Sequence, residues 1–189
     1  IVRFSNYTAL NPKNGDTIWT SPSSIVFGTP TPFQVEAEHF LFTPRGEVIQ
    51  VSDGKRIQKG LIFLHKTRDW SIYNTPTRVS DTLYAVSGVE KANGDAYAFR
   101  IPKTIEELKK KGLKEIWHTQ VSQNRYYASP LIHEGLMYII TRENILTVLN
   151  ADNGKTLYTQ KIAGAKGQAY PSITAAGGNI FVSIDDGTL

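Results

Sequence analysis

The chain has 189 residues, 40% of them hydrophobic and 20% charged, a balance typical of a folded globular protein and not of a disordered one. It contains no cysteine, which excludes a disulfide framework, a thiolate metal site and a cysteine nucleophile. Its net charge of +4 comes from scattered lysines and arginines, and no apolar run approaches the ~18 residues of a membrane span, so we expect neither a nucleic-acid partner nor a membrane span.

The first predicted element is an outer β-hairpin within residues 1–20. The stretch from Ala9 to Trp19 indicates a strand, an Asn-Gly turn and a second strand that carries a large aromatic residue. A similar stretch returns from Val148 to Tyr158. Repetition on this scale predicts a fold built from an array of similar units.

Three full units follow this hairpin, over 29–60, 72–120 and 126–162, and an inner hairpin over 168–189 ends the chain. Each begins with a small or hydroxyl residue before an apolar stretch, and an aromatic residue stands eight positions after the second member of the opening pair. This spacing predicts a repeated inner hairpin, followed in the full units by an outer one. The opening pairs are Thr31-Pro32, Thr75-Pro76, Ser129-Pro130 and Ser172-Ile173, and the aromatic residues are Phe40, Tyr84, Tyr138 and Phe181.

The second full unit contains an insertion. Thr104 and Glu107 have the spacing of a helix capping box, helix-forming residues continue to Lys111, and Gly112 can adopt the left-handed conformation that ends a helix. We therefore expect one short surface helix near 104–111, ornamental to the array.

The repeat length defines the architecture. Apart from the insertion, the units recur at roughly 40 to 45 residues, which is the period of a four-stranded β-propeller blade. The sequence thus predicts an all-β propeller of four-stranded antiparallel blades, with strands for about 4 to 4.5 blades. A β-sandwich is the alternative, although it gives no reason for repeats in register.

The turn-bearing stretch matches the pattern Ala-x-Asp/Asn-x-x-Thr/Asn-Gly-x-x-x-Trp. Its two good copies resemble the tryptophan-docking repeat of the PQQ-like, quinoprotein-type β-propeller family, and two degenerate copies extend the resemblance over most of the chain. In this motif the closing aromatic residue packs flat between neighbouring blades; here these residues are Trp19, Trp117 and Tyr158. The matching positions are Ala9, Asn11, Asn14, Gly15 and Trp19 in the first copy, and Val148, Asn150, Asn153, Gly154 and Tyr158 in the second.

Propellers of this family usually have seven or eight blades, so we expect the chain to be an excerpt of a longer array. The alternative is a closed four-bladed ring, in which the head and the tail share one blade. In that ring residues 1–7 and 183–189 would compete for one strand position. Open edge strands predict that other blades or another chain cover them.

The candidate binding site is a rim of the predicted propeller. Tyr73, Tyr127 and Tyr170 each stand three residues before the second member of an opening pair, and Thr29 has that position in the first full unit. This position precedes the innermost strand, so it should lie at the rim of the axial channel, where propellers commonly bind ligands. Three further residues are close in sequence, namely Trp70, Arg125 and Tyr126.

Aromatic side chains beside arginine suit a peptide, a protein anchor or a sugar. The alternative is that the tyrosines fill gaps between blades. We expect no metal site, because the four histidines are well spread and Asp185-Asp186-Gly187 is more typical of a hairpin turn than of a calcium loop. No nucleophile elbow or phosphate loop is present, so we assign no catalytic residue.

The family resemblance implies a non-catalytic binding or assembly scaffold, bacterial and exported to the periplasm or the cell surface, with no cofactor and with a protein or glycan partner. The outer-membrane-assembly lipoprotein of the same fold is one such member. The alternative is a PQQ-dependent dehydrogenase whose cofactor-binding blades lie outside this chain. True quinoprotein dehydrogenases hold PQQ with a metal ion such as calcium under a vicinal disulfide, which a chain without cysteine cannot form.

Overall fold

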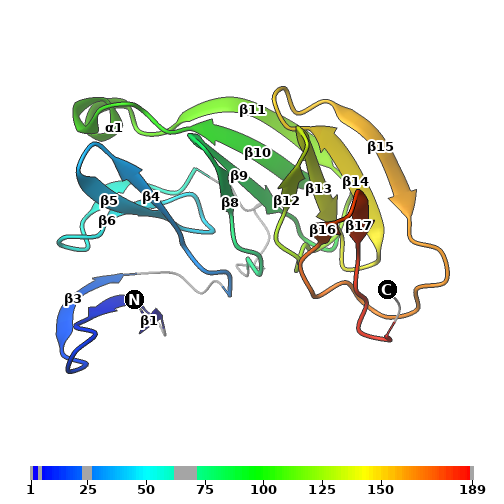
Figure 1. Cartoon of the computed structure of the whole chain (residues 1–189), viewed down its shortest axis with the longest axis horizontal. Coiled ribbons are helices and arrows are strands. Elements are labelled where there is room, and N and C mark those ends of the chain that lie inside the picture. The colour runs from blue at the N-terminus through cyan, green and yellow to red at the C-terminus, as the bar shows by residue number, and fades with distance from the viewer. Residues whose placement is uncertain (1, 4–5, 23–26, 62–71, 188–189) are drawn as a thin grey trace.

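The computed structural model describes residues 2–3, 6–22, 27–61 and 72–187. They form antiparallel sheets that follow one another along an arc (Figure 1). The first sheet has three strands, β1 (Val2–Arg3), β2 (Asn6–Leu10) and β3 (Thr17–Pro22). It therefore has one strand more than the predicted leading hairpin, because Val2 and Arg3 pair with β2.

Three four-stranded sheets come next, and a two-stranded sheet follows them. In each four-stranded sheet the strands are ordered along the chain, as in a propeller blade. The predicted all-β architecture of four-stranded antiparallel blades is confirmed. The blades are β4 (Thr31–Val35), β5 (Glu38–Phe42), β6 (Val48–Gln50) and β7 (Arg56–Gln58); β8 (Thr77–Val79), β9 (Thr82–Ser87), β10 (Gly94–Arg100) and β11 (Lys114–Val121); β12 (Leu131–His133), β13 (Leu136–Ile140), β14 (Ile145–Asn150) and β15 (Thr156–Lys161); and then β16 (Thr174–Ala176) with β17 (Asn179–Phe181).

The innermost strands lie next to one another. Strand β4 contacts β8, β8 contacts β12, and β12 contacts β16. The apolar cores lie at the seams, because each buried cluster combines residues of two neighbouring sheets. Phe42 of β5 and Phe99 of β10, for example, pack edge to face with ring centroids 5.7 Å apart. Burial of apolar surface between blades therefore holds the arc together.

The inserted helix α1 (Ile105–Lys111) confirms the predicted helix. The Thr104 side chain accepts a hydrogen bond from the Glu107 backbone N–H at 3.2 Å, and Gly112 ends the helix at a φ of 73°. The helix is not ornamental, however. Leu108 is fully buried in the cluster between the first two complete blades, so α1 is part of that seam.

The register of the first complete blade differs from the prediction by two residues. Thr31 lies opposite Phe42, as Thr77 lies opposite Tyr84 in the next blade. The opening pair equivalent to Thr75-Pro76 is therefore Thr29-Pro30 and not Thr31-Pro32, and the equivalent aromatic residue is Phe42 and not Phe40. The cause is the β4–β5 hairpin, whose two arms each extend two residues further than those of β8–β9.

A closing tryptophan connects two of the outer hairpins to the next blade. The Trp19 indole N–H donates to the carbonyl oxygen of Val51 at 2.8 Å, and Trp117 donates to that of Ala151 at the same distance. Both rings lie on a turn glycine, since a Cβ added to Gly54 would meet Trp19 at 2.5 Å. Tyr158 has the same register position in β15 and is 48% exposed.

Candidate binding rim

Four aromatic side chains form a continuous column at the predicted rim. Phe27 stacks on Tyr73 with centroids 5.1 Å apart, Tyr73 meets Tyr127 edge to face at 4.6 Å, and Tyr127 stacks on Tyr170 at 4.6 Å. One ring comes from each of four successive repeat units. We refer to these four residues as the aromatic column.

Phe27 is the residue that sequence reasoning missed. In the corrected register it stands three residues before Pro30, the position that the sequence analysis gave to Thr29. Its backbone N–H donates to the Ile72 carbonyl at 2.7 Å, which ties its loop to the next blade. The following Gly28 approaches the Asn74 carbonyl so closely that a Cβ would collide with it.

A ladder of hydrogen bonds spaces the column. The Thr29 backbone N–H donates to Thr75 Oγ1 at 3.0 Å, and the Thr75 N–H donates to Ser129 Oγ at 2.9 Å. The Ser129 N–H continues the series to Ser172 Oγ at 3.3 Å. Each of these residues stands two positions after a ring of the column. The hydroxyl ladder therefore fixes the distance between successive rim loops.

The column is accessible at its ends. Phe27 is 66% exposed and Tyr170 is 49% exposed, whereas Tyr73 and Tyr127 are half-buried. Because the rings stack on each other, most of their faces are covered inside the column. The exposed surface of the column is therefore greatest at its two terminal residues.

A charged group lies beside the column. The Arg142 guanidinium forms an ion pair with Glu90 at 2.8 Å, and Arg125 approaches the same carboxylate at 3.7 Å. Hydrogen bonding to Tyr127, and then to Glu90, raises the pKa of Arg142, so this side chain stays charged. The predicted Arg125 thus belongs to an ion-pair network next to the tyrosines.

One predicted rim residue, Tyr126, is not part of the column. Tyr126 is buried, and its hydroxyl donates to the Ser122 carbonyl at 2.7 Å. Burial raises the pKa of Tyr126, and the buried Asn74 amide donates to the Tyr126 carbonyl at 3.0 Å. Tyr126 is therefore a seam residue, since consecutive residues of an extended segment point to opposite sides. Trp70 lies outside the described residues.

The carboxylates of the acidic turn Asp185-Asp186 accept hydrogen bonds from backbone N–H groups. Asp185 accepts a hydrogen bond from the Gln168 N–H at 2.6 Å, and Asp186 accepts from the N–H groups of Lys166 and Gly167 at 2.7 and 2.9 Å. Among the residues that the structure describes, no three His, Asp or Glu side chains lie close enough to hold a metal ion.

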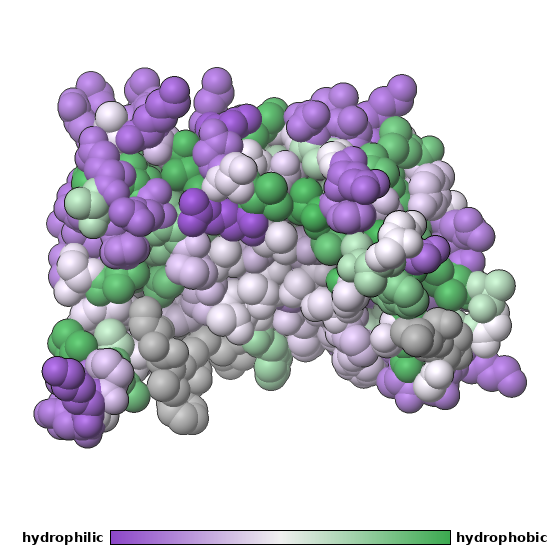
Figure 2. Space-filling model, in the orientation of Figure 1, coloured by the Kyte–Doolittle hydropathy of each residue, from purple (hydrophilic) through white to green (hydrophobic). Residues whose placement is uncertain are grey.

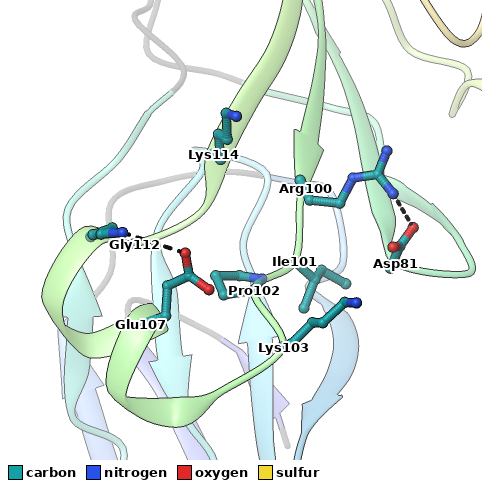
Figure 3. Close-up of a pocket in the computed structure, with 9 residues that line it drawn as sticks. Asp81, Arg100, Ile101, Pro102, Lys103, Glu107, Gly112 and Lys114 are labelled. Carbon is teal, nitrogen blue, oxygen red and sulfur yellow. Dashed lines mark hydrogen bonds and ion pairs between the residues drawn. The ribbon is translucent and has the colours of Figure 1, made fainter.

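A second surface feature is a shallow pocket between α1 and the end of β10 (Figure 3). Basic side chains surround it, but Arg100 pairs with Asp81 at 2.7 Å and Lys111 approaches Glu107 at 3.7 Å. Figure 2 shows that hydrophilic side chains gather over the side of the molecule that carries α1. Because α1 joins the third and fourth strands of its blade, it lies at the opposite end of the strands from the column.

No helix among the described residues has the length and hydropathy to cross a membrane.

No family model and no curated protein matches the sequence. Solved structures do match. BamB from Moraxella catarrhalis has a TM-score of 0.57 and 11% identity over 97% of this chain and 53% of its own.

Two computationally designed proteins match in the same way. Ika8 gives a TM-score of 0.62 with 11% identity over 96% of this chain and 50% of its own, and Ika4 gives 0.54 with 13% identity over 85% and 88%. The chain thus spans about half the length of BamB and of Ika8. At these identities the likeness shows the fold alone, and that fold is a β-propeller.

Proposed function

We propose that this protein is a binding scaffold that presents the aromatic column to a protein partner. The observation that carries the proposal is the column itself: four rings from four successive units, in contact with one another and open at both ends. Aromatic side chains bury a large area and lose little conformational entropy on binding, so they are frequent anchors of protein interfaces.

The stacking of the rings favours a protein partner over a glycan. Sugars bind aromatic residues mainly through a free ring face, but Tyr127 and Tyr170 cover each other with nearly parallel planes, 9° apart. Ring edges at half-exposed positions can instead be covered by apolar side chains of an extended segment. We therefore infer that the partner presents such a segment along the column.

The rigidity of the rim supports the same function. The hydroxyl ladder and the contact between Gly28 and Asn74 fix each loop against its neighbour. A partner that binds a preformed surface does not have to order it, and more of the contact energy then appears as affinity.

A peptide-display selection on the immobilised protein tests this function. We expect selected peptides to lose at least about tenfold in affinity in Phe27→Ala and Tyr170→Ala, the two exposed ends of the column. Tyr158→Ala is the matched control, because Tyr158 is as exposed as Tyr170 and belongs to a different surface. Selected peptides that bind the column variants and the wild type with equal affinity contradict the proposal. Glycan binding that is lost in Tyr127→Ala would show that the partner is a sugar and not a protein.

We propose in addition that the protein is exported, to the periplasm or the cell surface, and acts without a cofactor. The resemblance of the turn motif to PQQ-like repeats supports export, and antibody detection in fractionated host cells tests it. For the cofactor, PQQ and calcium are added to the purified protein. We expect neither a red-shifted PQQ absorption nor dye reduction with an alcohol or a sugar. Either signal would favour the alternative function, a PQQ-dependent dehydrogenase.

A further inference from the structure

Two arginines beside the aromatic column approach the same acidic side chain. The Arg142 Nη1 atom lies 2.8 Å from Glu90 Oε1, and the Arg125 Nη2 atom lies 3.7 Å from the same oxygen. Glu143 also approaches Arg142, at 3.9 Å, but its side chain is 58% exposed, so water screens this attraction. Two guanidinium groups thus converge on a single carboxylate oxygen. We refer to Arg125 and Arg142 as the arginine pair.

Backbone hydrogen bonds hold the arginine pair in place. The Arg142 N–H, in the loop between β13 and β14, donates to the Arg125 carbonyl at 2.8 Å. The Ala169 N–H donates in turn to the Arg142 carbonyl at 3.3 Å. The loop that carries Glu90 is fixed as well, because the Glu90 carbonyl accepts a hydrogen bond from Gln123 Nε2 at 2.7 Å. The charged groups are therefore preorganised on the rim.

The arginine pair is continuous with the aromatic column. The Arg142 side chain forms a hydrogen bond with that of Tyr127, and the Tyr127 ring stacks on Tyr170 at 4.6 Å. Tyr170 is one of the two exposed ends of the column. An extended segment advances about 3.3 Å per residue, so a segment that covers Tyr170 reaches Arg142 within about three residues. A partner that binds the column therefore meets these charges.

The arginine pair has the capacity for a further ligand. Each guanidinium has five N–H donors, and one carboxylate oxygen accepts only some of them. The side chains of Arg142 and Arg125 are 23% and 25% exposed, so both can still be reached from solvent. Because folding has already removed most of the water around them, binding a ligand there adds little desolvation of the arginines.

We propose that the arginine pair binds a carboxylate of the partner segment, from an aspartate or a glutamate next to the apolar residues that cover the column. This inference rests on the proposed function and specifies the chemistry of the partner. A carboxylate is favoured because Glu90 already places one against both arginines. Hydrogen bonds between arginine and a carboxylate are also about twice as strong as neutral ones. The partner segment is thus apolar along the rings and acidic at Arg125 and Arg142.

Peptides from the display selection are the probe for this inference. Among those that lose affinity in Phe27→Ala or Tyr170→Ala, we expect enrichment of an aspartate or a glutamate within about three residues of an apolar residue. In one such peptide, replacing the acid by its amide should lower the affinity at least about tenfold. Column-dependent peptides without an acidic residue contradict the inference and leave the column itself as the binding site.

A double-mutant cycle tests the contact with Arg142. We expect Arg142→Gln to weaken the acidic peptide at least about tenfold and to leave its amide version almost unchanged. Lys91→Gln is the matched control, because it removes the same charge from an exposed position of the rim loop that carries Glu90. It should change the affinity less than about twofold at about 0.15 M salt. Equal losses for both peptides in Arg142→Gln would show that this arginine only supports Tyr127, which overturns the inference.

Glu90→Gln gives a readout in the opposite direction. Glutamine keeps an oxygen that accepts a hydrogen bond from Arg142, but it removes the charge that repels a second carboxylate. We expect the acidic peptide to bind at least about threefold more tightly and the amide peptide to bind as before. An unchanged or lower affinity of the acidic peptide contradicts the inference. If no selected peptide depends on Phe27 or Tyr170, the proposed function fails and this inference fails with it.

Discussion

Two seams of the arc solve the same packing problem with different side chains. At the seam after β11, the Trp117 ring covers Gly154 and its N–H bonds to Ala151. At the seam after β7, the register places Gln58 at that position, opposite Val48. Its amide oxygen accepts the Leu113 N–H at 2.9 Å and lies against Gly112, another glycine with a φ of 73°.

The comparison shows what the inserted helix does. Gln58 is smaller than tryptophan and buries less apolar surface, so its seam needs another source of apolar contact. Leu108 on α1 supplies it, together with Ile101 and Leu113 on either side of the helix, and the cluster at this seam includes all three. A left-handed glycine under a closing residue is thus common to both seams, while the apolar volume comes from different segments.

The largest expected effect is at the tryptophan seam. Trp117→Ala removes a large side chain that is 8% exposed, and we expect the free energy of unfolding to fall by about 3–5 kcal/mol. The corresponding Gln58→Ala removes mainly one hydrogen bond and should cost about 1 kcal/mol. Urea denaturation of both variants measures the difference, and equal losses would contradict the assignment of apolar packing to Trp117.

The helix seam should be almost as sensitive at Leu108. Leu108→Ala leaves a cavity in the cluster, and we expect a loss of about 2–5 kcal/mol in the free energy of unfolding. Lys110→Ala on the exposed side of α1 is the matched control and should change stability by less than about 0.5 kcal/mol. Thermal denaturation measures both variants. A small loss of stability in Leu108→Ala would show that the helix is ornamental.

Substitutions of the glycines under the closing residues test whether the side chain above each glycine is rigid or flexible. Gly135→Ala measures the backbone strain alone, about 1–2 kcal/mol, because its φ is 75° and no described atom lies within 4 Å. Gly154→Ala should cost more, since the new Cβ meets the Trp117 ring at 2.6 Å. Gly112→Ala should fall between the other two, because the Gln58 amide can move aside but then loses its hydrogen bond to Leu113. Chemical denaturation ranks the three, and a Gly112→Ala loss equal to that of Gly154→Ala would refute the distinction.

The smallest effect concerns the ion pair next to the helix. The hydrogen bond from Arg100 lowers the pKa of Asp81, so the pair stabilises the fold above the unfolded-state pKa and is lost as the pH falls through the folded one. Both side chains are about half exposed, so we expect Asp81→Asn to cost less than about 1 kcal/mol at pH 7. The difference from wild type should shrink below about pH 4 and in 1 M salt; a difference that persists in acid contradicts it.

Much of the fold follows from local patterns in the sequence. Alternating apolar residues and Asn-Gly turns define the outer hairpins, and the capping box defines α1 within one residue. The register of the first complete blade did not follow, because Thr29-Pro30 and Thr31-Pro32 are identical pairs in succession. The strand pairing and the inter-blade hydrogen bond from Thr29 to Thr75 distinguish them.

Local sequence patterns also predicted part of the rim. Counting from the opening pairs gave Tyr73, Tyr127 and Tyr170, which lie together. Phe27 was missed because the predicted register of the first complete blade was wrong by two residues. Tyr126 was included by proximity in sequence, which does not reveal the side to which a residue points. Gln58 offered no signal, because an amide at a position of aromatic residues is recognised only from strand pairing.

The hydroxyl ladder has a consequence for how opening of the molecule can be observed. The amide protons of Thr29, Thr75 and Ser129 each bond to a hydroxyl across one particular seam. In hydrogen–deuterium exchange each would report the separation of its own pair of blades and of no other. A chain of nearest-neighbour contacts should thus exchange from its ends inward, and these three protons would time that process seam by seam.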